Sequence, residues 1–141
     1  MMRYDPRLVQ PMRDELRAAG VTELTTVQAV DEALGAGGST VVVVNSVCGC
    51  AARNARPAVR MAMSHPVQPD RVVTVFAGQD IEATARARDY FTGVRPSSPA
   101  IALVNDGELE FILERHQIEG REAHEVASDL TGAYDRHLGK N

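Results

Sequence analysis

The amino-acid sequence predicts an α/β fold: a mixed β-sheet of about four strands with helices on both faces and additional N-terminal helices. Two short β-branched runs, 40–44 and 71–76, are typical of strands buried in a parallel sheet. Helix-compatible sequence separates these runs, as a parallel crossover requires. The turn 105–107, Asn-Asp-Gly, is a strong hairpin signal between two further apolar runs, so it adds an antiparallel pair.

The first part of the chain is predicted to be helical. In the range 5–19, apolar residues recur at helical spacing, Pro6 suits a first helical turn, and a glycine follows as a stop signal. A second helix begins after Thr25 or Thr26, either of which can cap it, and ends in the glycine-rich turn 35–38. The first strand then begins near Ser39.

The rest of the chain alternates strands and helices before it ends in a hairpin and a helix. A cysteine-bearing helix runs through Met63, and the other expected elements are a strand at 71–76, a helix at 81–91, strands at 100–104 and 108–113, and a helix at 121–138. This order, with the cysteines after the first strand of the parallel pair, is the thioredoxin-like arrangement. No repeat, linker or low-complexity tract interrupts it, so we expect a single thioredoxin-like domain over residues 1–141.

Composition and charge exclude several classes of partner. The 141 residues carry a net charge of −4, and aromatic residues make up only 4% of them, which disfavours nucleic-acid binding. The N-terminus lacks the apolar core of a signal peptide, and no apolar stretch approaches the length of a membrane span. We therefore expect a cytoplasmic protein that does not bind membranes.

The motif Cys48-Gly49-Cys50 contains both cysteines of the chain and follows the apolar strand directly. At the start of a helix, unpaired N–H groups and the helix dipole stabilise a thiolate and lower the thiol pKa. In a reducing compartment, two cysteines this close together are more often catalytic, redox-sensing or metal-binding than joined in a permanent structural disulfide bond. Two thiols cannot complete a zinc site alone, and no metal site is predicted because the remaining histidines lack ligand spacing.

Several segments of the chain resemble the bacilliredoxin family of small bacterial thioredoxin-like proteins. The segments that carry the resemblance are 45–52, 55–58, 74–80, 90–93, 96–99 and 115–120. The resemblance implies a thiol–disulfide oxidoreductase that removes bacillithiol, or a similar low-molecular-weight thiol, from protein mixed disulfides. Cys48 would be the attacking thiolate, and either Cys50 or a second low-molecular-weight thiol would resolve the adduct.

The resemblance also implies the partners of the reaction. No bound cofactor is expected, because bacillithiol or another low-molecular-weight thiol acts as co-substrate. The protein partners are oxidised, S-thiolated client proteins and the disulfide reductase of the small thiol, and a homodimer stays open as an oligomeric state. The chain departs from the family by carrying Arg53 in place of a glycine and by having no further cysteine near the C-terminus.

Four residues are expected to support the two thiols. Gly49 supplies a permissive backbone between them. Ser98 and Pro99 resemble the cis-proline loop of thioredoxin-like folds, which contacts the client. Arg53 adds a cation one turn beyond the thiols, where it would favour a thiolate or meet an anionic ligand, although a solvated surface arginine is the simpler interpretation. Glu119 is interpreted as a structural residue.

The spacing of the two cysteines also predicts their redox behaviour. A disulfide across a single intervening residue closes a tighter ring than one across two residues, so it should be strained and easily reduced. Two other functions stay open at this point. One is a general disulfide isomerase or oxidoreductase, and the other is a soft-metal or cluster carrier whose thiolates meet across a dimer interface.

Overall fold

The computed structural model describes residues 3–139 and contains a five-stranded mixed sheet. Its strand order is β1-β3-β2-β4-β5, with β1 (Thr22–Glu23), β2 (Ser39–Asn45), β3 (Arg71–Phe76), β4 (Ala100–Asn105) and β5 (Glu108–Leu113). Strand β3 is parallel to both β1 and β2, whereas β4 is antiparallel to β2 and β5. The predicted fold class is confirmed. The extra strand β1 has only two residues, too few to produce an alternating pattern in the sequence.

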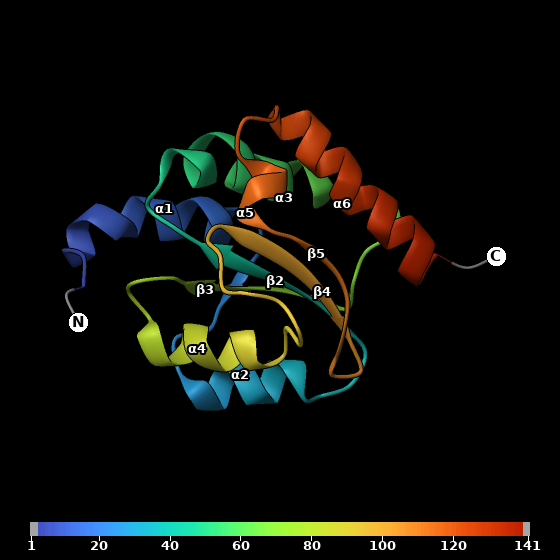
Figure 1. The fold of residues 1–141 in the computed structure, drawn as a ribbon, viewed down its shortest axis with the longest axis horizontal. Helices are drawn as coiled ribbons and strands as arrows, with labels where there is room; N and C mark the ends of the chain where they lie inside the picture. The colour runs from blue at the N-terminus through green and yellow to red at the C-terminus, as the bar shows by residue number, and fades with distance from the viewer. Residues whose placement is uncertain (1–2, 140–141) are drawn as a thin grey trace.

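Helices cover both faces of the sheet, so the molecule has three layers (Figure 1). The helices are α1 (Pro6–Ala18), α2 (Val27–Leu34), the π-helix η1 (Ala51–Ala55), α3 (Arg56–Ala62), α4 (Ile81–Asp89), α5 (Arg115–Ile118) and α6 (Ala123–Leu138). α1, α3 and α6 contribute to one apolar core, and α2 and α4 to the other. Within residues 3–139, no helix combines the length and apolarity needed to cross a bilayer.

The central strand β2 separates the two cores. Val41 and Val43 belong to the core beneath α3 and α6, while Val42 and Val44 belong to the core above α2 and α4. Each of these four side chains is 0% exposed. A strand with neighbours on both sides and helices on both faces has no solvated face, which explains its unbroken valine run.

Strand register brings three loops to one edge of the sheet. Val44 near the end of β2 pairs with Ala100 at the start of β4, and Ile101 pairs with Leu113 at the end of β5. The segment after β2, the loop before β4 and the segment after β5 therefore leave the sheet side by side. At the opposite end, Asp106 and Gly107 have φ values of 51° and 81°, which confirms the tight hairpin that the sequence predicted.

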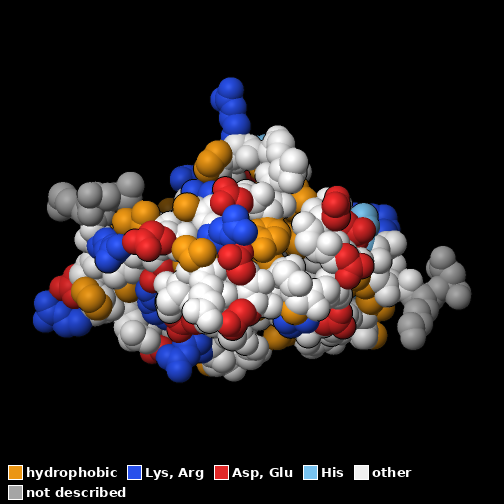
Figure 2. Space-filling model, turned by 90° about the horizontal axis from the view of Figure 1, so that it is seen from below, with side chains coloured by type: hydrophobic (Ala, Val, Ile, Leu, Met, Phe, Trp, Pro, Cys, Tyr) orange, Lys and Arg blue, Asp and Glu red, His pale blue; other side chains and the backbone are white. Residues whose placement is uncertain are grey.

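The surface over α2 and α4 carries both signs of charge, interspersed among uncharged side chains (Figure 2). One cross-helix contact there joins Arg86 of α4 to Asp31 of α2, with Nε and Oδ1 2.6 Å apart. The Arg86 guanidinium also lies 5.4 Å from the centroid of the Tyr90 ring. Such a mixed surface agrees with the small net charge.

A buried arginine joins the end of β2 to two helices. The side chain of Arg56 is only 4% exposed, and its Nε donates to Oε1 of Glu15 in α1 at 2.8 Å. Its Nη1 donates to Asn45 Oδ1 at 2.9 Å and to the Ser46 carbonyl at 2.8 Å. Asn45 in turn donates from Nδ2 to the Met12 carbonyl at 3.2 Å. The segment that follows β2 is therefore anchored to α1 and α3 at once.

Replacing this arginine by an apolar residue should destabilise the fold. Arg56→Met removes the hydrogen bonds that Arg56 donates to Glu15, Asn45 and the Ser46 carbonyl, and we expect a loss of about 3 kcal/mol in the free energy of unfolding. Arg60→Met is the matched control, because Arg60 also pairs with Glu15 but its side chain is 49% exposed, and it should cost less than about 1 kcal/mol. Urea unfolding of both variants measures the difference, and equal losses would contradict this account of the anchor.

Candidate active site

Cys48 and Cys50 lie in the segment between β2 and η1, and both are free, half-buried thiols. The Cys48 carbonyl accepts hydrogen bonds from the N–H groups of Ala51 and Ala52, at 3.1 and 3.2 Å. The Cys48 N–H itself donates to Ser46 Oγ at 3.3 Å. The predicted position of the thiols, at a turn from strand to helix, is confirmed. Their catalytic role stays a prediction.

The helix that begins at the cysteines changes type partway. Within η1 the turns are wide, and the Arg56 N–H donates to the carbonyl of Ala51, five residues back. The α-helical part then starts with Pro57 in its first turn, where the missing N–H of proline costs little. The π-helix passes directly into α3, so Pro57 does not interrupt the helix.

The two thiols have pKa values displaced in opposite directions. Partial burial opposes ionisation of Cys48, but hydrogen bonds from the Ser46 hydroxyl, the Ala51 N–H and Cys50 outweigh it, so the pKa of Cys48 lies below its ordinary value. Burial and the adjoining Cys48 sulfur raise the pKa of Cys50, although the charge of Arg115 partly opposes them. Cys48 is therefore the thiol that ionises first.

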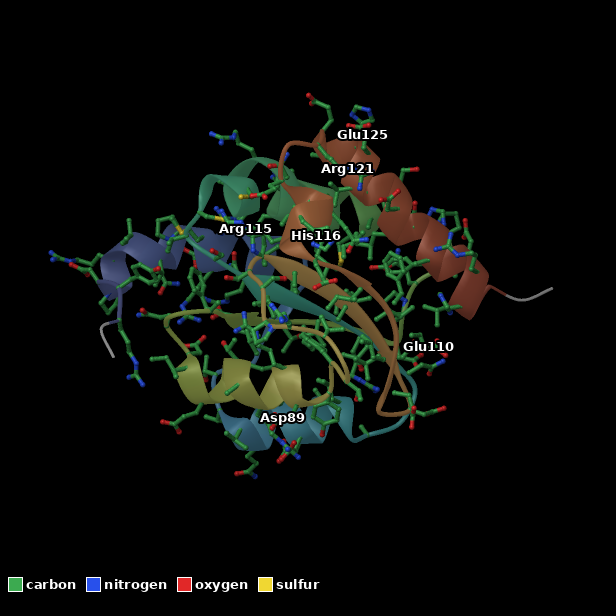
Figure 3. All side chains as sticks on the ribbon, viewed as in Figure 1. Asp89, Glu110, Arg115, His116, Arg121 and Glu125 are labelled. Atoms are coloured by element: carbon green, nitrogen blue, oxygen red, sulfur yellow. The ribbon has the colours of Figure 1, made fainter. Side chains whose placement is uncertain are left out.

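Arg115 begins helix α5 (Figure 3), and Glu119, the residue that caps the end of this helix, forms an ion pair with it. Arg115 donates from Nε to Glu119 Oε2 at 3.1 Å, and the Cys50 thiol donates to the same carboxylate oxygen at 3.8 Å. The pKa of Arg115 is raised, first by its hydrogen bond to Glu119 and then by the charges of Cys50 and Cys48. One cation therefore acts on both thiols.

The sequence did not identify Arg115 as a site residue, and it led us to interpret Glu119 as a structural residue. The structure places the Glu119 carboxylate in contact with the thiol of Cys50. The signal that was available is the segment 115–120, which contributes to the family resemblance. Helix α5 itself has four residues, too few for an apolar periodicity.

The proline loop that precedes β4 lies beside α5. The Ser98–Pro99 peptide bond is cis, as the resemblance implied. The Arg115 N–H donates to Ser97 Oγ at 3.2 Å, and Arg115 Nη1 donates to the Ser98 carbonyl at 3.4 Å. From the other face of the sheet, Arg88 donates to the Ser97 carbonyl at 3.1 Å. Contact of Ser98 and Pro99 with a client stays a prediction.

Arg53 and Gly49 are in close contact. Gly49 does not have a positive φ, so the expected need for a permissive backbone is not the reason for a glycine. Instead, a β-carbon at this position would lie 2.8 Å from Arg53 Nη2. Gly49 thus leaves room for the guanidinium of Arg53.

Beyond Gly49, Arg53 lines a pocket of about 360 Å³. The other lining residues are Asn54, Gly120, Arg121 and Glu122. Arg121 is held by its ion pair with Asp129, whose Oδ2 is 2.6 Å from Nη1. The pocket therefore lies between η1 and the segment that joins α5 to α6.

Metal ligation was also considered. Among residues 3–139, no group of three or more His, Cys, Asp or Glu side chains is placed so that it could hold a metal ion. A carrier function would therefore need ligands from elsewhere in addition to the two thiols.

Comparison with known proteins identifies similar sequences and folds. The family described as disulphide isomerase matches residues 4–138. A bacilliredoxin of Shouchella clausii is 53% identical over 130 residues, covering 92% of each chain. One of Staphylococcus haemolyticus is 50% identical over 134 residues, covering 95% of this chain and 92% of the other. A thioredoxin of Malassezia sympodialis superposes with a TM-score of 0.57 at 18% identity, covering 83% of this chain and 90% of the thioredoxin. This last similarity concerns the fold alone.

The opposite pKa displacements of the thiols predict different pH profiles of alkylation. A lowered pKa means that thiolate is present at lower pH, so Cys48 should reach half its maximal rate with iodoacetamide at a lower pH than a free cysteine does, and Cys50 at a higher pH. Peptide fragmentation mass spectrometry can follow each site in the intact reduced protein.

The Ser46 hydroxyl should contribute measurably to the low pKa of Cys48. In Ser46→Ala the hydrogen bond to the thiolate is lost, and the Cys48 midpoint should move to higher pH. Ser64→Ala is the control, since the Ser64 hydroxyl bonds only to the Met61 carbonyl, and it should leave both midpoints in place. A Cys48 midpoint at or above that of Cys50 would refute the assignment.

Proposed function

The chain belongs to the bacilliredoxin family, and on this premise we propose that it removes bacillithiol, or a similar low-molecular-weight thiol, from mixed disulfides on oxidised proteins. The observation that carries the proposal is the asymmetric pair Cys48 and Cys50 at the turn from β2 into a helix, one thiol with a lowered pKa and one with a raised pKa. A thiol–disulfide oxidoreductase of this kind needs one cysteine that is ionised and attacks the substrate disulfide, and a second cysteine that stays protonated until the adduct has formed.

The reaction proceeds by two exchanges. The Cys48 thiolate attacks the bacillithiol sulfur of the mixed disulfide, the bond to the client cysteine breaks, and the client thiolate leaves and takes a proton from solvent. Cys48 now carries bacillithiol as a mixed disulfide. Either the Cys50 thiolate attacks Cys48 Sγ and releases bacillithiol, or a second low-molecular-weight thiol attacks the adduct. In the first case the Cys48–Cys50 disulfide that remains is returned to two thiols by the small-thiol pool.

This scheme sets the partners of the protein. It needs no bound cofactor, because both electrons come from the small thiol, which its own disulfide reductase regenerates. The clients are S-thiolated proteins, and they dock against the proline loop at Ser98 and Pro99. We place the reaction in the cytosol, where low-molecular-weight thiols keep protein cysteines reduced.

The pocket that Arg53 lines is suited to the part of the small thiol that does not react. The Arg53 guanidinium lies against Gly49, the residue between the two cysteines, and the same side chain lines the pocket. An anionic or hydroxyl group of the small thiol would accept a hydrogen bond from the Arg53 guanidinium.

Transfer of the small thiol can be tested directly. A client protein carrying bacillithiol is mixed with the reduced Cys50→Ser variant, and intact-mass spectrometry should detect the bacillithiol adduct on Cys48 together with a freed client. With Cys48→Ser, transfer should fall by at least about a thousandfold, because the thiol that remains has a raised pKa and is not placed to attack first.

Three outcomes separate the candidate functions. Continued transfer by Cys48→Ser would remove the mechanism. Reshuffling of disulfides in a scrambled protein, without preference for thiolated clients, would favour the general isomerase that the description of the matching family suggests. Stoichiometric metal in the purified protein, lost in either cysteine variant, would favour the carrier.

The role of Arg53 predicts a substrate-specific effect. Arg53→Gln should raise the KM for a bacillithiol-modified client by about tenfold, the effect of losing one charge-assisted hydrogen bond, and leave reaction with an uncharged aromatic disulfide unchanged. Arg60→Gln is the control, as Arg60 is an arginine of the following helix that pairs with Glu15 instead. Equal KM values for Arg53→Gln and the wild type would contradict a binding role.

A further inference from the structure

The ion pair between Arg115 and Glu119 lies against the thiols, and the exchange scheme does not yet use it. We propose that this pair sets the order in which the two thiols react: Glu119 holds Cys50 as a protonated thiol while Cys48 attacks, and Arg115 supports the Cys50 thiolate in the second exchange. The inference rests on the proposed function, in which Cys50 resolves an adduct on Cys48.

The contacts around α5 support a role beyond stability. The side chains of Arg115 and Glu119 are 47% and 50% exposed, and an exposed pair of this kind contributes little to the free energy of unfolding. Yet Arg115 is held in place by two hydrogen bonds, because its backbone N–H donates to Ser97 Oγ and its Nη1 donates to the Ser98 carbonyl. The Arg115 side chain thus joins the proline loop to Glu119, whose carboxylate accepts a hydrogen bond from the Cys50 thiol.

The geometry separates the tasks of the two charges. The Cys50 thiol donates to Glu119 Oε2, and a carboxylate accepts a hydrogen bond from a thiol but repels a thiolate. Arg115 attracts both thiolates. In the reduced protein, therefore, Cys48 is the sulfur that becomes anionic, while Cys50 keeps its proton.

Formation of the adduct reverses this preference. Once Cys48 Sγ is part of a disulfide it is neutral, so the anion that opposed ionisation of Cys50 is gone and Arg115 acts on Cys50 alone. Cys50 then loses its proton to solvent and attacks Cys48 Sγ. The Cys48–Cys50 bond forms, the bond to the small thiol breaks, and that thiol leaves as a thiolate and is protonated by solvent. The two cysteines are oxidised and the small thiol is reduced.

The titratable and charged groups around Cys50 come from its own segment, from η1 and from α5 with its cap. Cys48 precedes it in the same loop, Arg53 of η1 lies against the neighbouring Gly49, Arg115 begins α5, and Glu119 caps that helix. Arg53 stays constant in the test below, so changes in pH dependence report on the α5 pair.

The test uses dithiodipyridine, an uncharged aromatic disulfide that releases a chromophoric thiopyridone at each exchange. With the reduced full-length protein, the first phase reports attack by Cys48 and the second reports attack by Cys50 on the adduct. The variant Cys50→Ser, which keeps only the first phase, verifies the assignment. Because neither bacillithiol nor a client is present, failure of the ordering role is distinguishable from failure of the proposed function.

Removing the two charges should have opposite effects on the second phase. In Glu119→Gln the pH midpoint should move down and the rate at neutral pH should rise about twofold to fivefold; in Arg115→Gln the midpoint should move up and the rate should fall by a similar factor. This is the size expected for a unit charge about 4 Å away at an exposed site. Glu108→Gln is the control, because it makes the same change at an exposed carboxylate at the far end of β5, and it should alter neither the pH midpoint nor the rate of the second phase.

The decisive result is that Glu119→Gln and Arg115→Gln shift the pH midpoint of the second phase in opposite directions. Both variants break the same ion pair, so a purely structural role would move both midpoints in the same direction or leave both unmoved, and either result would overturn the proposal. Slower resolution in Glu119→Gln would also overturn it, because it would make the carboxylate a proton acceptor for Cys50 instead. Arg115→Lys should restore the wild-type midpoint, since it restores the cation.

Discussion

The buried guanidinium of Arg56 is the constraint on which the rest of the site depends. It joins Glu15 of α1 to Asn45 and the Ser46 carbonyl at the end of β2. The Arg56 side chain is only 4% exposed, and a charged group buried this far is stable only when its hydrogen bonds are formed. The guanidinium and its partners therefore keep one relative arrangement. The segment that carries the thiols starts from this anchor, and its direction out of the sheet is thereby set.

A buried ion pair and an exposed ion pair have different roles at this edge of the sheet. The buried pair of Arg56 and Glu15 fixes where the backbone goes, because breaking it leaves unsatisfied groups in the interior. The exposed pair of Arg115 and Glu119 contributes little to folding; the charge of Arg115 acts to lower the pKa of Cys50, and Glu119 accepts a hydrogen bond from that thiol. Position and reactivity of the thiols thus depend on different residues.

Sequence patterns predicted the elements that are long or chemically distinctive. The valine run of β2 and the Asn-Asp-Gly hairpin were both predicted correctly, because full burial and a left-handed turn demand particular residues. Strand β1 and helix α5 were missed because two and four residues cannot show a period. The π-helix was missed because its sequence is also compatible with an α-helix.

For the site, the sequence by itself determined the two thiols, their place at the start of a helix and, through the family resemblance, the class of chemistry. These follow from local order along the chain, since a strand followed by a turn exposes the N–H groups that favour a thiolate. The tertiary structure alone decided which charges meet the thiols. Glu119 lies 69 residues from Cys50 in sequence, and only the antiparallel register of β4 and β5 brings it to the same edge of the sheet, where hydrogen bonding and charge make the two cysteines unequal.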